Sequence, residues 1–287
     1  MMGARTDQGA AVTAASAYRP QLVVDAVSRV FPTEGGEDVH ALSSASITVP
    51  KGDFVSLLGP SGCGKSTLFN LIAGLDTPTE GRVLLNGEDR SGQPGLVGYM
   101  LQKDLLLPWR TVLDNVTLGL EIQGVRRSRA AQVARPLLAH YGLGGFEGHY
   151  PGQLSGGMRQ RAALLRTLLY NREVLLLDEP FGALDAQTRA RMQEWLLDLW
   201  DDFKKTLLFV THDIDEAIYL SNRVYVMSPR PGRIVAEYPV ELERPRKPEI
   251  VTDPHFVELK SELQRVLAEA SAPADDAVDR AAPQEVA

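Results

Sequence analysis

The sequence is short of cysteine and of long apolar runs, and each shortage excludes a class of protein. Cys63 is the single cysteine, so no disulfide can form within the chain, which is usual for a reducing compartment such as the cytoplasm. No stretch approaches the roughly 20 consecutive apolar residues that cross a bilayer, and residues 1–20 lack the apolar segment of a secretory signal. We therefore expect any membrane association to run through a partner.

The chain also lacks an excess of basic charge. Its 30 Lys and Arg residues against 37 Asp and Glu residues give a formal net charge of −7. Domains that bind nucleic acid are usually net basic, so this balance argues against that class. The basic clusters at residues 126–129 and 244–247 fit solvated surface or linker better.

Apolar and polar patterning predicts an ordered region between two disordered ends. Residues 1–19 and 270–287 are rich in Ala and small polar residues without an apolar period, and we expect both to be disordered. Apolar runs predict strands at 21–30, 45–49, 54–58, 174–177 and 207–210, and helices at 65–73, 114–121, 185–200 and 253–268. The alternation of strand and helix favours a parallel sheet with helices on its faces. The stretch from about 103 to 169 is predicted to be a helical insert.

A glycine-rich segment between a buried strand and a helix matches the pattern of a phosphate-binding loop. Its residues are Gly59, Pro60, Ser61, Gly62, Cys63, Gly64, Lys65, Ser66 and Thr67. The glycines allow backbone N–H groups to turn toward phosphate oxygens, and the N-terminus of the following helix adds a positive dipole end. Lys65 would neutralise the β and γ phosphates, and the Ser66 hydroxyl would bind Mg²⁺.

Cys63 inside this loop has two interpretations. It is either a small residue that fits the loop, or a thiol made acidic by the helix N-terminus and Lys65.

Two carboxylates follow the apolar run at residues 174–177. Asp178 and Glu179 would stand at the carboxyl end of a buried strand, where open α/β sheets bind their ligands. Asp178 is predicted to hold Mg²⁺ through water, and Glu179 to orient and polarise the attacking water. An ordinary turn before Pro180 would have the same local sequence.

The run at 207–210 repeats this arrangement, and His212 follows it. We expect His212 to sense a γ phosphate, although the neighbouring Thr211 and Asp213 could simply cap the next helix.

The segment LSGGMRQR, residues 154–161, lies between the phosphate loop and the Asp-Glu strand. Together these motifs resemble the nucleotide-binding subunit of an ABC transporter, over about residues 21–268. The resemblance implies an α/β fold of the P-loop NTPase class, with a RecA-like parallel-sheet core, an N-terminal antiparallel β part and an inserted helical subdomain at about 103–169. It implies an ATPase domain over residues 20–244, followed by a linker and amphipathic helix over 245–269.

The resemblance also implies roles for three residues outside these motifs. Gln102, in YMLQKD, is the loop glutamine that contacts Mg²⁺ and the attacking water. Asp185 belongs to the loop that joins two active sites. Phe31 stacks on adenine, although an aromatic residue at a strand end can equally belong to the core.

In the family pattern, two subunits form a head-to-tail homodimer. Ser155, Gly156 and Gly157 of one subunit cap the γ phosphate of the ATP held by Lys65 of the other. Ser155 can donate a hydroxyl hydrogen bond, and the helix that follows adds its dipole. One subunit alone would therefore lack a complete site.

Several segments resemble the branch of the family that imports nitrate, sulfonates, taurine and pyrimidine precursors; they include GYMLQKDLLLPWRTVLDNV and FGALDAQTR. This implies ATP hydrolysis coupled to uptake of a small solute, with integral membrane permease subunits and an external solute-binding protein as partners. The implied location is peripheral, on the cytoplasmic face of the cell membrane. Met158 and Leu165 depart from the usual Gln and Ala, at positions that would not contact phosphate.

Other functions remain open. A soluble ABC ATPase acting on nucleic acid or ribosomes usually has two cassettes or a long coiled-coil insertion, and neither is present. A nucleotide or small-molecule kinase would share the phosphate loop but would have no use for LSGG. The run LLLPWR, residues 105–110, either grips a permease or packs inside the helical insert.

Overall fold

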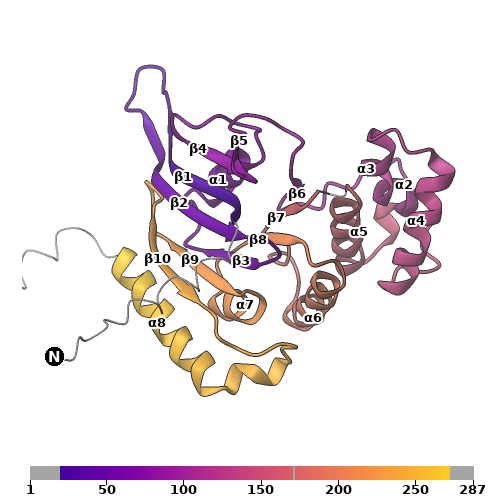
Figure 1. Ribbon diagram of the computed structural model, residues 1–287. Helices are drawn as coiled ribbons and strands as arrows, with labels where there is room; N and C mark the ends of the chain where they lie inside the picture. Colours follow the sequence, from indigo (N-terminus) through magenta and orange to yellow (C-terminus); the bar gives the residue numbers. More distant parts are fainter. Residues whose placement is uncertain (1–19, 171, 272–287) are drawn as a thin grey trace, which may run out of the picture.

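The computed structural model describes residues 20–170 and 172–271 (Figure 1). The N-terminal segment predicted to be disordered lies outside these residues, as does the C-terminal one from residue 272 onward. Ala270 and Ser271 form the end of the last helix instead, so that helix runs two residues further than the boundary predicted for the tail.

A six-stranded sheet forms the centre of the molecule. Its strand order is β10 (Ile234–Pro239), β9 (Arg223–Met227), β3 (Phe54–Leu58), β8 (Thr206–Thr211), β7 (Val174–Asp178) and β6 (Gly98–Met100). The strands pair in parallel except at one edge, where β10 runs antiparallel to β9. The parallel core predicted from the sequence is therefore confirmed.

A four-stranded antiparallel sheet covers one side of this core (Figure 1). Its order is β2 (Val39–Pro50), β1 (Pro20–Phe31), β4 (Glu80–Leu85) and β5 (Glu88–Asp89). Asn86 and Gly87 join the last two strands with φ angles of 53° and 84°, as expected for the tight turn that this pair favours. Strand β2 begins well before the predicted residue 45.

Alternating side chains of the central strands feed two separate cores. Val55 and Leu57 of β3 face α1 (Lys65–Ile72) and the antiparallel sheet. Phe54 and Leu58 belong to the second core, on the opposite face. That face is covered by α5 (Gly156–Leu169), α6 (Ala186–Phe203), α7 (Ile214–Leu220) and α8 (Pro254–Ser271). The sheet is thus buried on both faces, which explains its continuous apolar strands.

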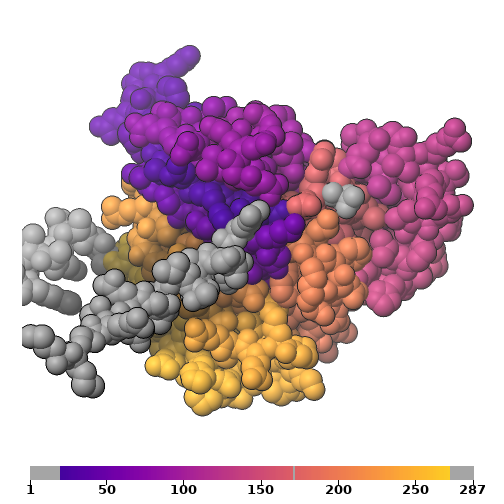
Figure 2. Space-filling model, viewed as in Figure 1, coloured from indigo at the N-terminus to yellow at the C-terminus, as the bar shows by residue number. Residues whose placement is uncertain are grey.

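The helical insert forms a lobe beside the sheets (Figure 2). It contains α2 (Val112–Val116), α3 (Leu118–Ile122), α4 (Arg127–His140), a 3-10 turn (Pro151–Gln153) and α5. The single helix predicted at 114–121 is two short helices in the structure. Asn115 is fully buried, and its amide donates to the carbonyls of Leu107, Arg110 and Thr111. This side chain therefore fixes the chain at residues 107–111.

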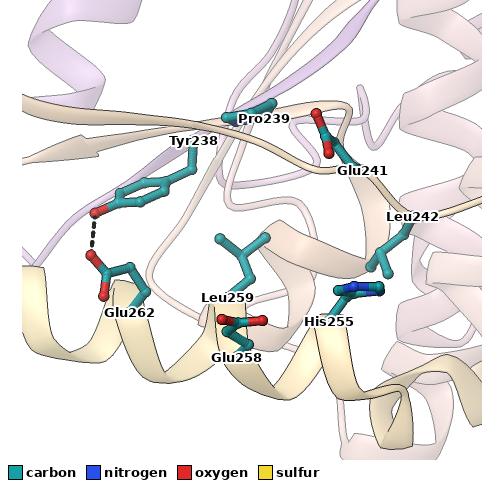
Figure 3. A pocket seen from close by; sticks show the side chains of 8 residues that line it. All are labelled: Tyr238, Pro239, Glu241, Leu242, His255, Glu258, Leu259 and Glu262. Carbon is teal, nitrogen blue, oxygen red and sulfur yellow. Dashed lines mark hydrogen bonds between the residues drawn. The ribbon is translucent and has the colours of Figure 1, made fainter.

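The C-terminal segment packs against α7. The buried Arg246 donates to the carbonyls of Ile218, Tyr219 and Ser221 at the end of that helix, before the 3-10 turn η2 (Pro248–Thr252). Helix α8 then lies beside β10 around a cavity of about 420 Å³ (Figure 3). Within residues 20–170 and 172–271, no helix is both long enough and apolar enough to span a bilayer.

Candidate functional site

The predicted site residues lie at the carboxyl ends of four neighbouring strands of the central sheet. Leu58 of β3 pairs with Thr211 of β8, and Val210 of β8 pairs with Asp178 of β7. Met100 of β6 pairs with Leu177 of β7. These strands are parallel and end in register. The phosphate loop, His212, the Asp-Glu pair and Gln102 therefore all lie at the carboxyl end of the sheet.

The phosphate loop needs glycine where its backbone turns into α1. Gly64 caps that helix with a φ of 112°, a conformation that residues with a Cβ rarely adopt. A Cβ at this position would also lie 2.9 Å from the carbonyl oxygen of Ala41. Both the dihedral angle and the space therefore exclude a side chain, and the loop can present its backbone N–H groups at the N-terminus of α1.

Lys65 is buried within this loop. Its Nζ donates to the carbonyl oxygens of Gly59 and Pro60, at 2.8 and 2.9 Å. The same nitrogen lies 3.6 Å from Oε1 of Glu179. A buried ammonium group held by neutral carbonyls and one carboxylate has a strong affinity for further anionic oxygens, such as those of a phosphate.

Cys63 occupies the loop as a small buried side chain, 1% exposed. Burial raises the pKa of its thiol, and this outweighs the lowering caused by Lys65. This favours the first interpretation, a small residue that fits the loop, because desolvation has a larger effect here than the nearby positive charge.

Three predicted site residues surround the Glu179 carboxylate. Its carboxylate lies beside Lys65, it accepts a 3.4 Å hydrogen bond from Nε2 of Gln102, and its Oε2 lies 3.3 Å from Nδ1 of His212. Its φ of 43° lies in the left-handed region, which is strained for a residue with a side chain. The strain sits directly after β7, where the chain leaves the sheet.

Asp178 is buried beside hydroxyl groups. It forms a hydrogen bond with Ser66, and the Tyr99 hydroxyl donates to its Oδ2 at 3.5 Å. Burial raises the pKa of Asp178, against the lowering by Ser66 and Lys65. Burial and the Asp178 charge together raise the pKa of Tyr99, so its hydroxyl stays a neutral donor. Tyr99 was absent from the predicted site; its place on β6, the strand next to Asp178, was the available signal.

The segment LSGGMRQR, residues 154–161, which we call the signature segment, belongs to a different part of the structure, the start of α5. Ser155 is exposed and caps α5, accepting a 3.3 Å hydrogen bond from the Met158 amide. Asp185 is likewise exposed and caps α6 through the Thr188 amide at 2.9 Å. A Cβ on Gly157 would lie 3.1 Å from Cγ2 of Thr188, so the two helix starts are neighbours. Among the described residues, no hydrogen bond or ion pair joins Ser155 to the phosphate loop.

Phe31 ends β1 at the surface. Its side chain is 36% exposed and belongs to neither core cluster. The Arg29 guanidinium lies 4.5 Å from the ring centroid and also pairs with Asp76. The structure therefore places Phe31 outside the core, partly exposed and with Arg29 against one face of its ring.

Comparison with known proteins agrees with this geometry. Residues 42–182 match the family model described as "ABC transporter". The chain is 47% identical over 253 residues to a taurine import ATP-binding protein of Rhizobium johnstonii, covering 86% of this chain and 96% of the relative. It is 42% identical over 252 residues to a nitrate import ATP-binding protein of Synechocystis, covering 86% and 94% of the two chains.

A solved structure shows the same fold. A dimeric ATP-binding cassette in a post-hydrolysis state, bound to ADP and Pi, superposes with a TM-score of 0.67 at 31% identity. The match covers 77% of this chain and 100% of that one. With a phosphate loop, an acidic strand end and a signature helix in the expected places, this chain belongs to the ABC transporter family of ATP-binding proteins.

Proposed function

We propose that this chain is the ATP-hydrolysing subunit of an importer, energising uptake of a small solute through a partner permease. The observation that carries the proposal is the convergence of Lys65, Gln102 and His212 on the Glu179 carboxylate. Relatives named for import at more than 40% identity support an importer over a soluble ATPase acting on nucleic acid or ribosomes.

The contacts of Lys65 suggest how ATP enters the site. The β and γ phosphate oxygens can replace the loop carbonyls and Glu179 as partners of the ammonium group. Glu179 would then be free to accept a proton from the attacking water, with Gln102 orienting that water. His212, beside the same carboxylate, would donate to the γ phosphate. The left-handed backbone of Glu179 holds its carboxylate among these groups.

The Ser66 hydroxyl and the Asp178 carboxylate fit Mg²⁺ as oxygen ligands. Across the described segments, no cluster of three or more His, Cys, Asp or Glu side chains is placed to hold a metal ion. The ion would therefore share its ligands with the nucleotide and water, and Gln102 is a further candidate ligand. When bound, Mg²⁺ supplies charge neutralisation for the phosphates.

The separation of Ser155 from the phosphate loop supports a shared site. Ser155 is exposed at the start of α5, and Gly156 and Gly157 beside it are half-buried, so we infer that this segment meets the ATP of a second subunit. Asp185 begins the neighbouring helix and would lie in the same interface. We infer a head-to-tail homodimer with two composite sites.

Phe31→Ala tests the adenine platform. Losing one stacking contact of about 1 to 3 kcal/mol should weaken ATP binding by roughly 5- to 150-fold, measured by equilibrium titration with a fluorescent ATP analogue. Because Phe31 belongs to neither core cluster, the variant should stay folded, which circular dichroism can check. Val235→Ala, at a similarly exposed position on β10 of the other sheet, serves as the control. Unaltered affinity in Phe31→Ala would remove this residue from the site.

The run at residues 105–110 carries the proposed permease contact. Leu106 is buried in the insert, whereas the side chains of Leu105 and Trp109 are 51% and 73% exposed. Arg166 of α5 donates to the carbonyls of Asp104 and Leu105, so the exposed residues are tied to the signature helix. Leu106 therefore packs within the insert, whereas the permease contact stays a prediction, supported by the exposure of Leu105 and Trp109.

The importer itself is tested by co-expression with a candidate permease from the same genome. The wild-type chain should co-purify with that permease from detergent-solubilised membranes, and Trp109→Ser should reduce recovery by at least tenfold. Leu75→Ser, which alters another exposed apolar residue, is the control. Co-purification with nucleic acid instead would favour the soluble alternative. A thermal-shift screen of the associated solute-binding protein against nitrate, taurine, other sulfonates and pyrimidines would identify the solute.

A further inference from the structure

A buried carboxylate without a role in the proposed mechanism lies next to His212. Glu216 is in the first turn of α7, and its side chain is only 6% exposed. The helix does not need this carboxylate as a cap, because Asp213 already accepts the Glu216 amide at 3.1 Å. Burying a carboxylate costs free energy unless its oxygens are hydrogen-bonded, so the residues that donate to Glu216 bear on its role.

Both oxygens of Glu216 have donors from other elements. Gln193 of α6 donates to Oε1 at 2.9 Å, and the hydroxyl of Thr211, the last residue of β8, donates to Oε2. Glu216 therefore joins a strand end, its own helix and α6. Helix α6 begins at Ala186, directly after its cap Asp185, in the loop that we place at the dimer interface.

The same network holds both chain neighbours of His212. The Asp213 amide donates to the Thr211 hydroxyl at 3.0 Å, and Asp213 in turn accepts from the Glu216 amide. His212 lies between these two residues, and its own side chain is exposed. The network thus fixes the backbone on either side of a ring that would otherwise be free to leave Glu179.

Burying the Glu216 carboxylate has a cost in stability. Burial raises the pKa of Glu216 and the Asp213 charge adds to the increase, whereas Thr211, Gln193 and Arg189 oppose it. An apolar residue could fill the position without that desolvation cost. The described hydrogen bonds of the carboxylate all lead to β8 and α6, which carry residues of the ATP site. A role of Glu216 in that site would explain why a carboxylate is buried here.

We propose that Glu216 is a positioning residue that holds His212 against Glu179 and links it, through Gln193, to the helix that starts at the dimer interface. This inference rests on the proposed function, because it gives Glu216 a role only through His212. It predicts that removing the carboxylate lowers turnover without weakening ATP binding.

The first test is a mutant cycle. Glu216→Gln and Thr211→Val should each lower kcat by roughly 10- to 100-fold with KM for ATP unchanged, since misplacing a group by about 1 Å can cost about 100-fold. In a His212→Ala background the same changes should cause no further loss, as expected for residues that act as a unit. Unchanged kcat, or a full loss on top of His212→Ala, would overturn the proposal.

The control removes an equivalent hydrogen bond elsewhere. Tyr238 donates to Glu262 at 3.1 Å beside the cavity between β10 and α8 (Figure 3). Tyr238→Phe deletes a hydroxyl-to-carboxylate bond, as Thr211→Val does, but it should leave kcat unchanged. Thr211→Val keeps the β-branched shape of the buried side chain, so it tests the network even if Glu216→Gln unfolds the chain.

A second measurement does not depend on activity. The chain has five histidines, and the ring signals of His212 can be assigned by their absence from His212→Ala. Those signals should shift in Thr211→Val and Glu216→Gln and stay in place in Tyr238→Phe. Unshifted signals would overturn the positioning role. A wild-type chain with no ATPase activity would instead contradict the proposed function, and the ring signals would still test the network.

Discussion

Replacing Glu179 by glutamine should reduce ATP turnover by roughly 10² to 10⁴, the usual contribution of a general base. The amide keeps the size of the side chain and a carbonyl oxygen for the contact with Gln102, but it cannot accept the proton of the attacking water. ATP should still bind, because Lys65 and the loop amides are unchanged. The ATP-bound dimer should therefore accumulate, which size-exclusion chromatography with light scattering can measure.

Glu241→Gln provides the control for this variant. Glu241 lines the cavity beside α8, which belongs to neither the phosphate loop nor the strand ends around Glu179 (Figure 3). Its turnover should equal that of the wild type. Wild-type hydrolysis in Glu179→Gln would show that another group activates the water.

Ser155→Arg should abolish hydrolysis while leaving ATP bound. The new side chain places bulk and positive charge at the exposed start of α5, where the γ phosphate of the partner's ATP is proposed to lie. Losing the cap on the Met158 amide should cost about 0.5 to 2 kcal/mol, so the chain should remain folded. Ser261→Arg makes the same exchange at an exposed position of α8 and should remain active.

Most of the nucleotide site can be predicted from the sequence because its motifs are short and continuous. The loop around Gly64, the two acids at the end of β7 and His212 after β8 each follow a buried apolar run. Strands β3, β7 and β8 have such runs because both of their faces are covered. Parallel pairing then brings their ends to one edge, so the convergence on Glu179 follows from topology.

Elements without a continuous apolar run are not predicted from the sequence. Strand β6 has three residues, and β10 alternates between half-buried and exposed positions along its length. Both depend on pairing with a longer neighbour for their stability. The insert is also hard to divide from sequence, since Thr117 separates α2 from α3 without a glycine or proline.

Polar contacts between residues far apart in the sequence are not predicted either, because no local pattern links the two partners. Tyr99 and Asp178 are 79 positions apart, and Gln193 and Glu216 are 23 apart. Only the Asp213 and Glu216 spacing leaves a local trace, since it matches the first and last positions of a capping box. The structure uses the carboxylate differently, to bind Thr211 and Gln193.

The central claim is that each ATP site is built from two chains, and mixing two inactive variants tests it most directly. Ser155→Arg chains keep a sound Lys65, and Lys65→Ala chains keep a sound Ser155, so a heterodimer has one intact site and one doubly damaged site. Each purified homodimer should be inactive, and ATPase activity should return on mixing. Normal hydrolysis by the Ser155→Arg homodimer would contradict the shared site, since the phosphate loop would then work without the signature of a partner.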